Sequence, residues 1–177
     1  GELDLTGVEN ASNPDGVVAQ ITVNIEEKPF VNPFTDVKEG EWYYDSVMWA
    51  VQNGITSGAT ETTFDFDGLS ERCQVVTFLW RAAGEPEPET TENPFTDVNE
   101  GHYFYKAVLW AYEKGITQGI SDTEFGPFAK CTRGQVVTFL HRVEGTPESS
   151  FVNTLEDVNE SHYFYDAVLW AAENGIT

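Results

Sequence analysis

The chain has 177 residues, of which 30 are Asp or Glu and only nine are Lys or Arg, so its formal net charge is −21. This balance excludes a nucleic-acid-binding protein, because phosphate recognition requires clustered Lys and Arg. The chain is 40% hydrophobic, which is enough for one or two small domains with a packed core. No apolar run is long enough to cross a membrane, so we expect no membrane insertion.

Residues 1–31 differ from the rest of the chain. Residues 17–25 are rich in β-branched side chains and follow the turn sequence Asn13-Pro14-Asp15-Gly16, which predicts a short strand. We interpret residues 1–31 as an N-terminal β segment and linker at the end of a preceding module.

From Asn32 onward the sequence repeats. Residues 32–84 align without gaps on residues 93–145, an offset of 61, and roughly half of the positions are identical. Residues 157–177 align in the same way on residues 97–117. The predicted organisation is a first repeat over 32–91, a second over 92–152 and a partial third over 153–177. Such a period indicates units that cannot bury their apolar faces alone.

Each repeat is predicted to be a helix, a loop and a second helix. The first repeat has an apolar helical period from about Tyr44 to Asn53, with Gly54 after it, and another from about Glu71 to Gly84. The second repeat places its helices over 104–114 and 133–144. The acidic, proline-bearing spacer 85–92 is expected to be extended and solvated. The fold class is therefore mostly α.

Arg72 and Arg133 stand at the predicted start of the second helices. A cation is unfavourable there, because a helix N-terminus carries partial positive charge. Thr132 and Gln135 form a predicted capping box, which makes Arg133 the first helical residue. Either an anionic ligand sits at these arginines, or each forms a salt bridge with a neighbouring carboxylate.

The loops carry further candidate residues. Asp36 and Asp97 either meet a ligand or fix the turn before the first helix. Residues 65–68 read Asp-Phe-Asp-Gly, a fragment of a calcium loop or simply a turn. Trp42 lies on a loop, and Tyr103 and Tyr163 are its equivalents in the other repeats. Trp42 either stacks on a sugar or packs against the rest of the protein. The mid-helix residues Trp49, Trp110 and Trp170 are predicted to pack between helices.

No catalytic constellation is recognisable. His102, His141 and His162 have no nucleophile or metal-ligand spacing around them. The two cysteines, Cys73 and Cys131, allow one disulfide but match no metal motif. The sequence therefore predicts no enzyme, no cofactor and no metal.

Taken together, these motifs resemble the S-layer homology (SLH) domain of bacterial surface proteins. The resemblance rests on Phe-Thr-Asp-Val at 34–37 and 95–98, on residues 42–47 and 50–58, and on Thr-Arg-Gly-Gln at 132–135, which is similar to the family's Thr-Arg-Ala-Glu. It covers about residues 32–177, with the third repeat half present.

The resemblance implies a pseudo-threefold arrangement of three repeats with grooves between them. It also implies non-covalent anchoring, outside the cell, to a secondary cell-wall polysaccharide attached to peptidoglycan, often pyruvylated. The residues that it points to as ligand-binding are Arg133, Arg72, Trp42, Tyr103, Gly58 and Gly119. We keep Asp36 and Asp97 as further candidates from the loop sequence.

Two departures from the family pattern bear on the site. Glu71 stands beside Arg72 and is expected to neutralise it, so Arg133 is the stronger candidate. The incomplete third repeat lacks an arginine helix, which is expected to leave an apolar gap that either a second molecule or an upstream segment of the chain would fill. The alternatives to wall anchoring are a structural protein–protein interaction module and an accessory region of an exported enzyme.

Overall fold

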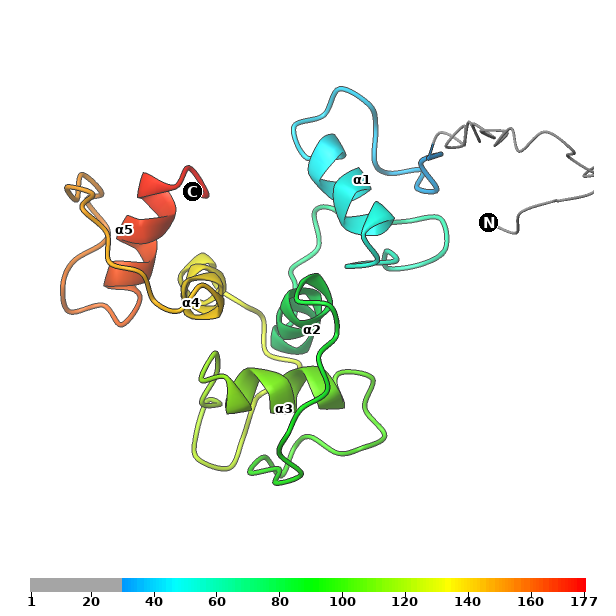
Figure 1. Ribbon diagram of the computed structural model, residues 1–177. Helices are drawn as coiled ribbons and strands as arrows, with labels where there is room; N and C mark the ends of the chain where they lie inside the picture. Colours follow the sequence, from blue (N-terminus) through cyan, green and yellow to red (C-terminus); the bar gives the residue numbers. More distant parts are fainter. Residues whose placement is uncertain (1–29) are drawn as a thin grey trace, which may run out of the picture. The chain divides into compact units, whose positions relative to one another are not determined.

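The computed structural model describes residues 30–177, and the strand expected over 17–25 lies outside the described residues. Within the described part the chain forms five α-helices and no β-strand (Figure 1). The helices are α1 (Tyr44–Gln52), α2 (Arg72–Ala82), α3 (Tyr105–Glu113), α4 (Arg133–Val143) and α5 (Tyr165–Glu173). The prediction of a mostly helical repeat protein is confirmed.

The helix ends follow the local sequence signals. After α1 the chain turns at Gly54, whose φ is +69°, a left-handed conformation that glycine adopts without strain. At the start of α4, the backbone N–H of Gln135 donates to Thr132 Oγ1 at 3.3 Å and the N–H of Thr132 donates to Gln135 Oε1 at 3.0 Å. This capping box fixes Arg133 as the first helical residue, as predicted.

Helices pack across repeat boundaries rather than within a repeat. The second helix of one repeat lies against the first helix of the next, so α2 packs on α3 and α4 packs on α5, and α2 also contacts α4 (Figure 1). The largest core cluster joins α2, α3, α4 and the loop before α4, and includes Val76, Phe104, Val108, Phe125 and Phe139. Each repeat thus buries its apolar face against a neighbour, which is why a single repeat is not a folding unit.

The tryptophans show where this packing is incomplete. Trp110 on α3 and Trp170 on α5 are 5% and 8% exposed, beneath α2 and α4 respectively, but their equivalent Trp49 on α1 is 59% exposed. No helix within residues 30–177 packs on α1, which is held by its own loops through Phe34, Val37 and Met48. The prediction that all three tryptophans pack between helices is therefore wrong for Trp49.

The spacer over residues 85–92 is non-helical and largely exposed, as expected, but hydrogen bonds hold both of its ends. Trp80 Nε1 donates to the carbonyl of Pro86 at 2.8 Å, and the backbone N–H groups of Glu89 and Thr90 donate to Glu113 on α3 at 2.7 and 3.1 Å. These bonds fix the path from α2 to the next repeat.

Candidate ligand-binding pockets between the repeats

The loop between the two helices of each repeat is braced by the aspartate that precedes the first helix. Asp97 accepts hydrogen bonds from the backbone N–H groups of Phe125 and Gly126 at 2.9 and 2.8 Å. Asp36 accepts from Phe64 and Asp65 at 2.9 and 2.7 Å, and the hydrogen bond from the Phe64 amide holds the pKa of Asp36 below its ordinary value. These contacts are those of the structural alternative, in which the carboxylate fixes the loop.

Gly58 and Gly119 mark the place where this loop passes over the braced segment. Their φ angles are +88° and +83°. A Cβ on Gly119 would lie 2.5 Å from the carbonyl of Glu124 and 2.6 Å from the Phe95 ring. Only glycine combines this conformation with so close an approach. Both glycines line a pocket, at equivalent positions of the first and second repeats.

The second of these cavities, here called the repeat-2 pocket, has a volume of about 360 Å³ and draws its walls from all three repeats. Arg72 comes from α2, Gly119 and Ile120 from the loop of the second repeat, and Tyr163 from the third repeat. The remaining lining residues are Thr117, Gln118, Gln135, Thr138, Phe139 and Arg142. Within residues 30–177 the walls offer cationic, hydroxyl, amide and aromatic groups and no carboxylate.

Arg72 is the unusual member of the repeat-2 pocket. It is only 4% exposed, and its guanidinium lies between the rings of Phe125 and Phe139, 4.9 and 5.3 Å from their centroids. Nε donates to the carbonyl of Phe125 at 3.0 Å, and Nη2 lies 3.5 Å from Thr117 Oγ1. Burial lowers the pKa of Arg72. A buried cation of this kind normally requires a negative partner.

The expected neutralising partner of Arg72 is engaged elsewhere. Glu71 forms an ion pair with Lys130 of the second repeat at 3.0 Å, across an isolated antiparallel bridge. Among the described residues no carboxylate pairs with Arg72, so the expectation that Glu71 neutralises it is wrong. The guanidinium has five N–H groups, and the donors that have no partner in the described part of the chain are available to an anion.

Arg133 stands in the corresponding place one repeat later. Its Nη2 donates to Thr177 Oγ1 at 2.6 Å, and Thr177 is the equivalent of Thr117. Unlike Arg72, Arg133 is exposed. The arginine of each repeat therefore contacts the loop of the following repeat, and Arg72, rather than Arg133, lines the repeat-2 pocket.

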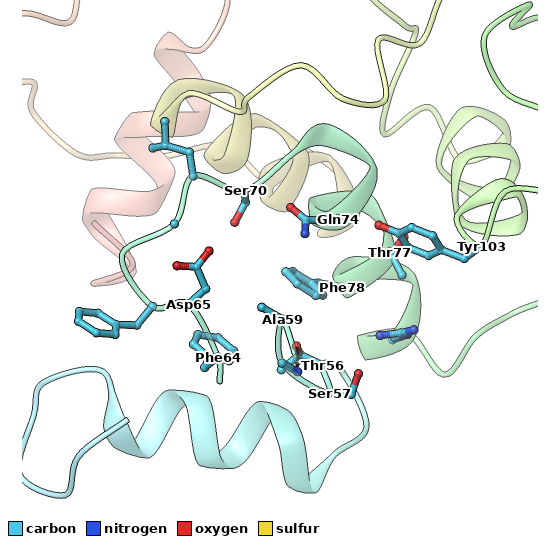
Figure 2. A pocket seen from close by; sticks show the side chains of 15 residues that line it. Thr56, Ser57, Ala59, Phe64, Asp65, Ser70, Gln74, Thr77, Phe78 and Tyr103 are labelled. Carbon is cyan, nitrogen blue, oxygen red and sulfur yellow. Dashed lines mark hydrogen bonds between the residues drawn. The ribbon is translucent and has the colours of Figure 1, made fainter. Parts of the chain in front are cut away.

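The equivalent cavity of the first repeat, here called the repeat-1 pocket, has a volume of about 370 Å³ (Figure 2). Its walls come from the loop over 56–70, from Gln74, Thr77, Phe78 and Arg81 of α2, and from Tyr103 of the second repeat. Within residues 30–177 no arginine occupies the place that Arg72 holds in the repeat-2 pocket.

Two aromatic residues of the entry loops also contribute to the pocket of a neighbouring repeat. Tyr103 and Tyr163 each line the pocket of the preceding repeat. Trp42, their equivalent, is 90% exposed and makes an edge contact with Tyr43, with ring centroids 5.4 Å apart. Tyr103 is thus placed at a pocket as a ligand-contacting residue would be, and Trp42 is presented at the surface.

Sequence reasoning missed Arg81 and Arg142, which lie near the ends of α2 and α4 and also line the two pockets. Their Nη1 groups donate to the carbonyls of Ile55 and Ile116 at 3.2 and 3.0 Å, which joins the second helix to the start of the loop. The signal that would have found them is their recurrence at the repeat offset of 61 residues.

The remaining candidates are the segment 65–68, His141 and the two cysteines. Residues 65–68 form a turn closed by a hydrogen bond from the N–H of Gly68 to the carbonyl of Asp65 at 3.0 Å, and the described part of the chain contains no cluster of metal-ligating residues. His141 Nε2 lies 2.9 Å from the carbonyl of Pro147 and repeats the spacer contact of Trp80. Both cysteines are free thiols.

The structure is thus that of a helical repeat protein with polar pockets at the junctions between repeats. The family model described as "S-layer homology domain" matches residues 33–65 and 94–137. The chain carries S-layer homology repeats, the non-catalytic modules that bind cell-wall polymers and anchor surface proteins to the wall, and the predicted family is confirmed.

The chain is similar to several surface proteins. It is 29% identical over 117 residues to a cell surface protein of Thermoanaerobacter kivui and 28% identical over 130 residues to a surface-layer 125 kDa protein of Lysinibacillus sphaericus. These matches cover 64% and 73% of the chain, and 15% and 11% of the relatives. An endoglucanase of a Bacillus strain is 31% identical over 117 residues, which are 66% of the chain and 12% of the enzyme.

The chain therefore spans only a small part of the length of these relatives. The family and the surface proteins that match it assign the chain to the cell surface, in association with the cell wall. No helix in residues 30–177 is long and apolar enough to cross a membrane.

Proposed function

We propose that the chain anchors its parent protein to an anionic, pyruvylated secondary cell-wall polysaccharide, and that the repeat-2 pocket holds the acidic sugar. The observation that carries this proposal is the guanidinium of Arg72, which is buried, close to the rings of Phe125 and Phe139, and without a carboxylate partner among the described residues. A planar guanidinium matches a carboxylate with two parallel hydrogen bonds.

The other walls of the repeat-2 pocket suit a sugar ring. Gln118, Gln135 and Thr138 can exchange hydrogen bonds with hydroxyl groups, and Tyr163 offers an aromatic face. Arg142 adds a second positive charge at the same cavity. With a net charge of −21 on the whole chain, an acidic polymer is repelled at long range and must be held by a local, preformed cationic site.

The proposal is tested by sedimenting the protein with purified cell-wall sacculi before and after chemical removal of the secondary polymer. We expect retention on intact walls and loss of retention on stripped walls. Equal retention on both, or retention on neither, would contradict polymer anchoring. Free polymer released by the stripping should compete with intact walls for the protein.

The exposed face of α1 supports a second part of the proposal. Trp110 and Trp170 are buried beneath a second helix, so the equivalent face around Trp49 is shaped to receive a helix of the α2 and α4 kind. Closure by such a helix would give the pseudo-threefold arrangement, and a second molecule supplies a substitute in its absence. Sedimentation equilibrium should show self-association that Trp49→Gln weakens; a strictly monomeric protein would contradict this part.

The endoglucanase relative favours one further role, as the wall-binding region of an exported enzyme. In that case the described repeats would supply attachment and another region the catalysis. Polysaccharide hydrolysis by the chain alone would contradict this division, and the proposal predicts none.

A further inference from the structure

Besides Arg72, which lines only the repeat-2 pocket, the two pockets differ in the side chains of a second wall. The repeat-1 pocket has Ala59 and Asp65 where the second repeat has Ile120 and Gly126. The backbone is alike at the second position of each pair, with φ of +63° at Asp65 and +70° at Gly126. The difference is therefore one of side chains on a conserved frame.

In the second repeat the larger side chain of this wall is at the first position, Ile120, and in the first repeat it is at the second position, Asp65. A Cβ on Gly126 would lie 2.9 Å from Ile120 Cδ1, so the isoleucine fills the space that an aspartate would need. In the first repeat the small Ala59 leaves that space open, and Asp65 lines the cavity. The exchange replaces an apolar wall by an anionic one.

The carboxylate of Asp65 is available to a ligand. Figure 2 shows it directed toward the side of the cavity where Ser70 and Gln74 lie. It takes part in none of the ion pairs within residues 30–177. The cation of this cavity, Arg81, donates to the carbonyl of Ile55 at 3.2 Å and lies 3.8 Å from Glu85.

The two pockets therefore differ in electrostatic character. In the described part of the chain the repeat-2 pocket contains Arg72 and Arg142 and no acidic side chain. The repeat-1 pocket contains the carboxylate of Asp65, unpaired within that same part, and one arginine that is already engaged. A carboxylate accepts hydrogen bonds only, so it favours hydroxyl and ammonium donors and repels a second carboxylate.

From this contrast we propose that the repeat-1 pocket selects an amino sugar and rejects an acidic one, with Asp65 as the residue that determines the specificity. The inference rests on the proposed function, in which these cavities hold sugar units of the wall polymer. One chain then reads two chemically different sugars, the acidic one at the repeat-2 pocket and the amine-bearing one at the repeat-1 pocket.

Amide NMR separates the two sites, because Gly58 and Gly119 report on the repeat-1 and repeat-2 pockets individually. The probes are methyl β-D-glucosaminide, which carries an ammonium group, and methyl β-D-glucuronide, which carries a carboxylate. We expect the glucosaminide to shift the Gly58 amide and to bind there about fivefold more tightly than the glucuronide. In Asp65→Asn, which keeps the size of the side chain, this preference should disappear.

The reciprocal change transfers the anionic wall to the other pocket. The double variant Ile120→Ala, Gly126→Asp should lose the response of Gly119 to the glucuronide, and the matched variant Ile120→Ala, Gly126→Asn should keep it. Circular dichroism checks that both variants are folded.

The outcomes distinguish this inference from the proposed function. If neither probe shifts Gly119 in the unmodified protein, the proposed anion site is wrong. If Gly119 responds to the glucuronide but Gly58 shows no response to the glucosaminide, or responds equally to both probes, the selectivity of the repeat-1 pocket is overturned. An unchanged preference in Asp65→Asn would remove that residue from the account.

Discussion

The guanidinium of Arg72 lies against the loop of the following repeat, with Nη2 3.5 Å from Thr117 Oγ1. The same relationship joins Arg133 to Thr177. An arginine that looks misplaced at the start of its own helix is thus correctly placed for the neighbouring loop, and the cavity that Arg72 lines lies at a junction between repeats.

The first prediction concerns the arginines. Arg72→Gln should weaken binding to intact sacculi by about 10- to 100-fold, because it removes charge-assisted hydrogen bonds worth about 1.5–3 kcal/mol. The affinity of Arg72→Lys should lie between those of the unmodified protein and Arg72→Gln, because an ammonium group keeps the charge but lacks the forked geometry of a guanidinium. Sedimentation binding curves measure the effect.

The controls for this series are Lys38→Gln, which removes a charge from an exposed loop, and Arg133→Gln, which alters the exposed arginine that contacts Thr177. Lys38→Gln should leave binding unchanged, and Arg133→Gln should have a smaller effect than Arg72→Gln. Thermal unfolding of each variant shows whether a loss of binding reflects a loss of fold. A fully folded Arg72→Gln protein that binds normally would exclude Arg72 from the site.

A second prediction uses two glycines with similar backbone conformations. Gly119→Ala should lower the free energy of unfolding by about 2–4 kcal/mol, because the left-handed conformation and the close contacts with Glu124 and Phe95 both oppose a Cβ. Gly115, with φ of +70°, has no atom within 4 Å of the position that a Cβ would take, so Gly115→Ala should cost only about 1 kcal/mol. Urea denaturation compares them, and equal losses would refute the packing argument.

A third prediction concerns pH. The hydrogen bond from the Phe64 amide depresses the pKa of Asp36 in the folded state, whereas an unfolded aspartate titrates near about 3.9. The stabilisation is therefore complete above the unfolded pKa and is lost as the pH falls through the folded value. The difference in urea midpoint between the unmodified protein and Asp36→Asn should be constant above about pH 5 and shrink below about pH 4.

The control for the pH experiment is Asp122→Asn, in a loop carboxylate that accepts no hydrogen bond within the described part of the chain. Its midpoint should follow that of the unmodified protein at every pH. A difference for Asp36→Asn that stayed constant down to about pH 2 would show that protonation of Asp36 does not contribute.

The fourth prediction contrasts two equivalent tryptophans. Trp110→Ala should destabilise the fold by about 3–5 kcal/mol, because it empties a buried position between α2 and α3. Trp49→Ala should change the free energy of unfolding of the monomer by less than about 0.5 kcal/mol, since its side chain is already largely solvated. A comparable loss for both, at a protein concentration where the chain is monomeric, would contradict the solvated position of Trp49.

The helices are predictable from sequence because local signals agree with their packing. The apolar period of residues 133–144, the capping box of Thr132 and the glycine after each first helix act within a few residues, and the observed bounds differ from the predicted ones by one or two residues. The period of 61 residues likewise predicts that the repeats pack on one another.

The site is less predictable, since it depends on contacts between repeats. Proximity in sequence favours Glu71 as the partner of Arg72, but Glu71 pairs with Lys130, 59 residues away. The burial of Arg72 follows from Phe125 and Phe139, which are also distant in the chain. Trp49 has a local sequence context similar to that of Trp110, but no helix of the described residues packs on it, whereas α2 packs on Trp110. The residues around Trp49 in the sequence do not indicate this difference.

The repeat-2 pocket takes walls from three successive repeats. If such pockets hold the sugars of the polymer as proposed, the number of binding sites on a chain is not equal to its number of repeats. An open array of repeats has fewer complete pockets than repeats. In a closed ring of repeats the number of complete pockets equals the number of repeats. A single added helix that closes the ring would then raise the number of binding sites and also tether them at a high effective concentration on one polymer strand, so its gain in avidity would greatly exceed the contribution of its own contacts.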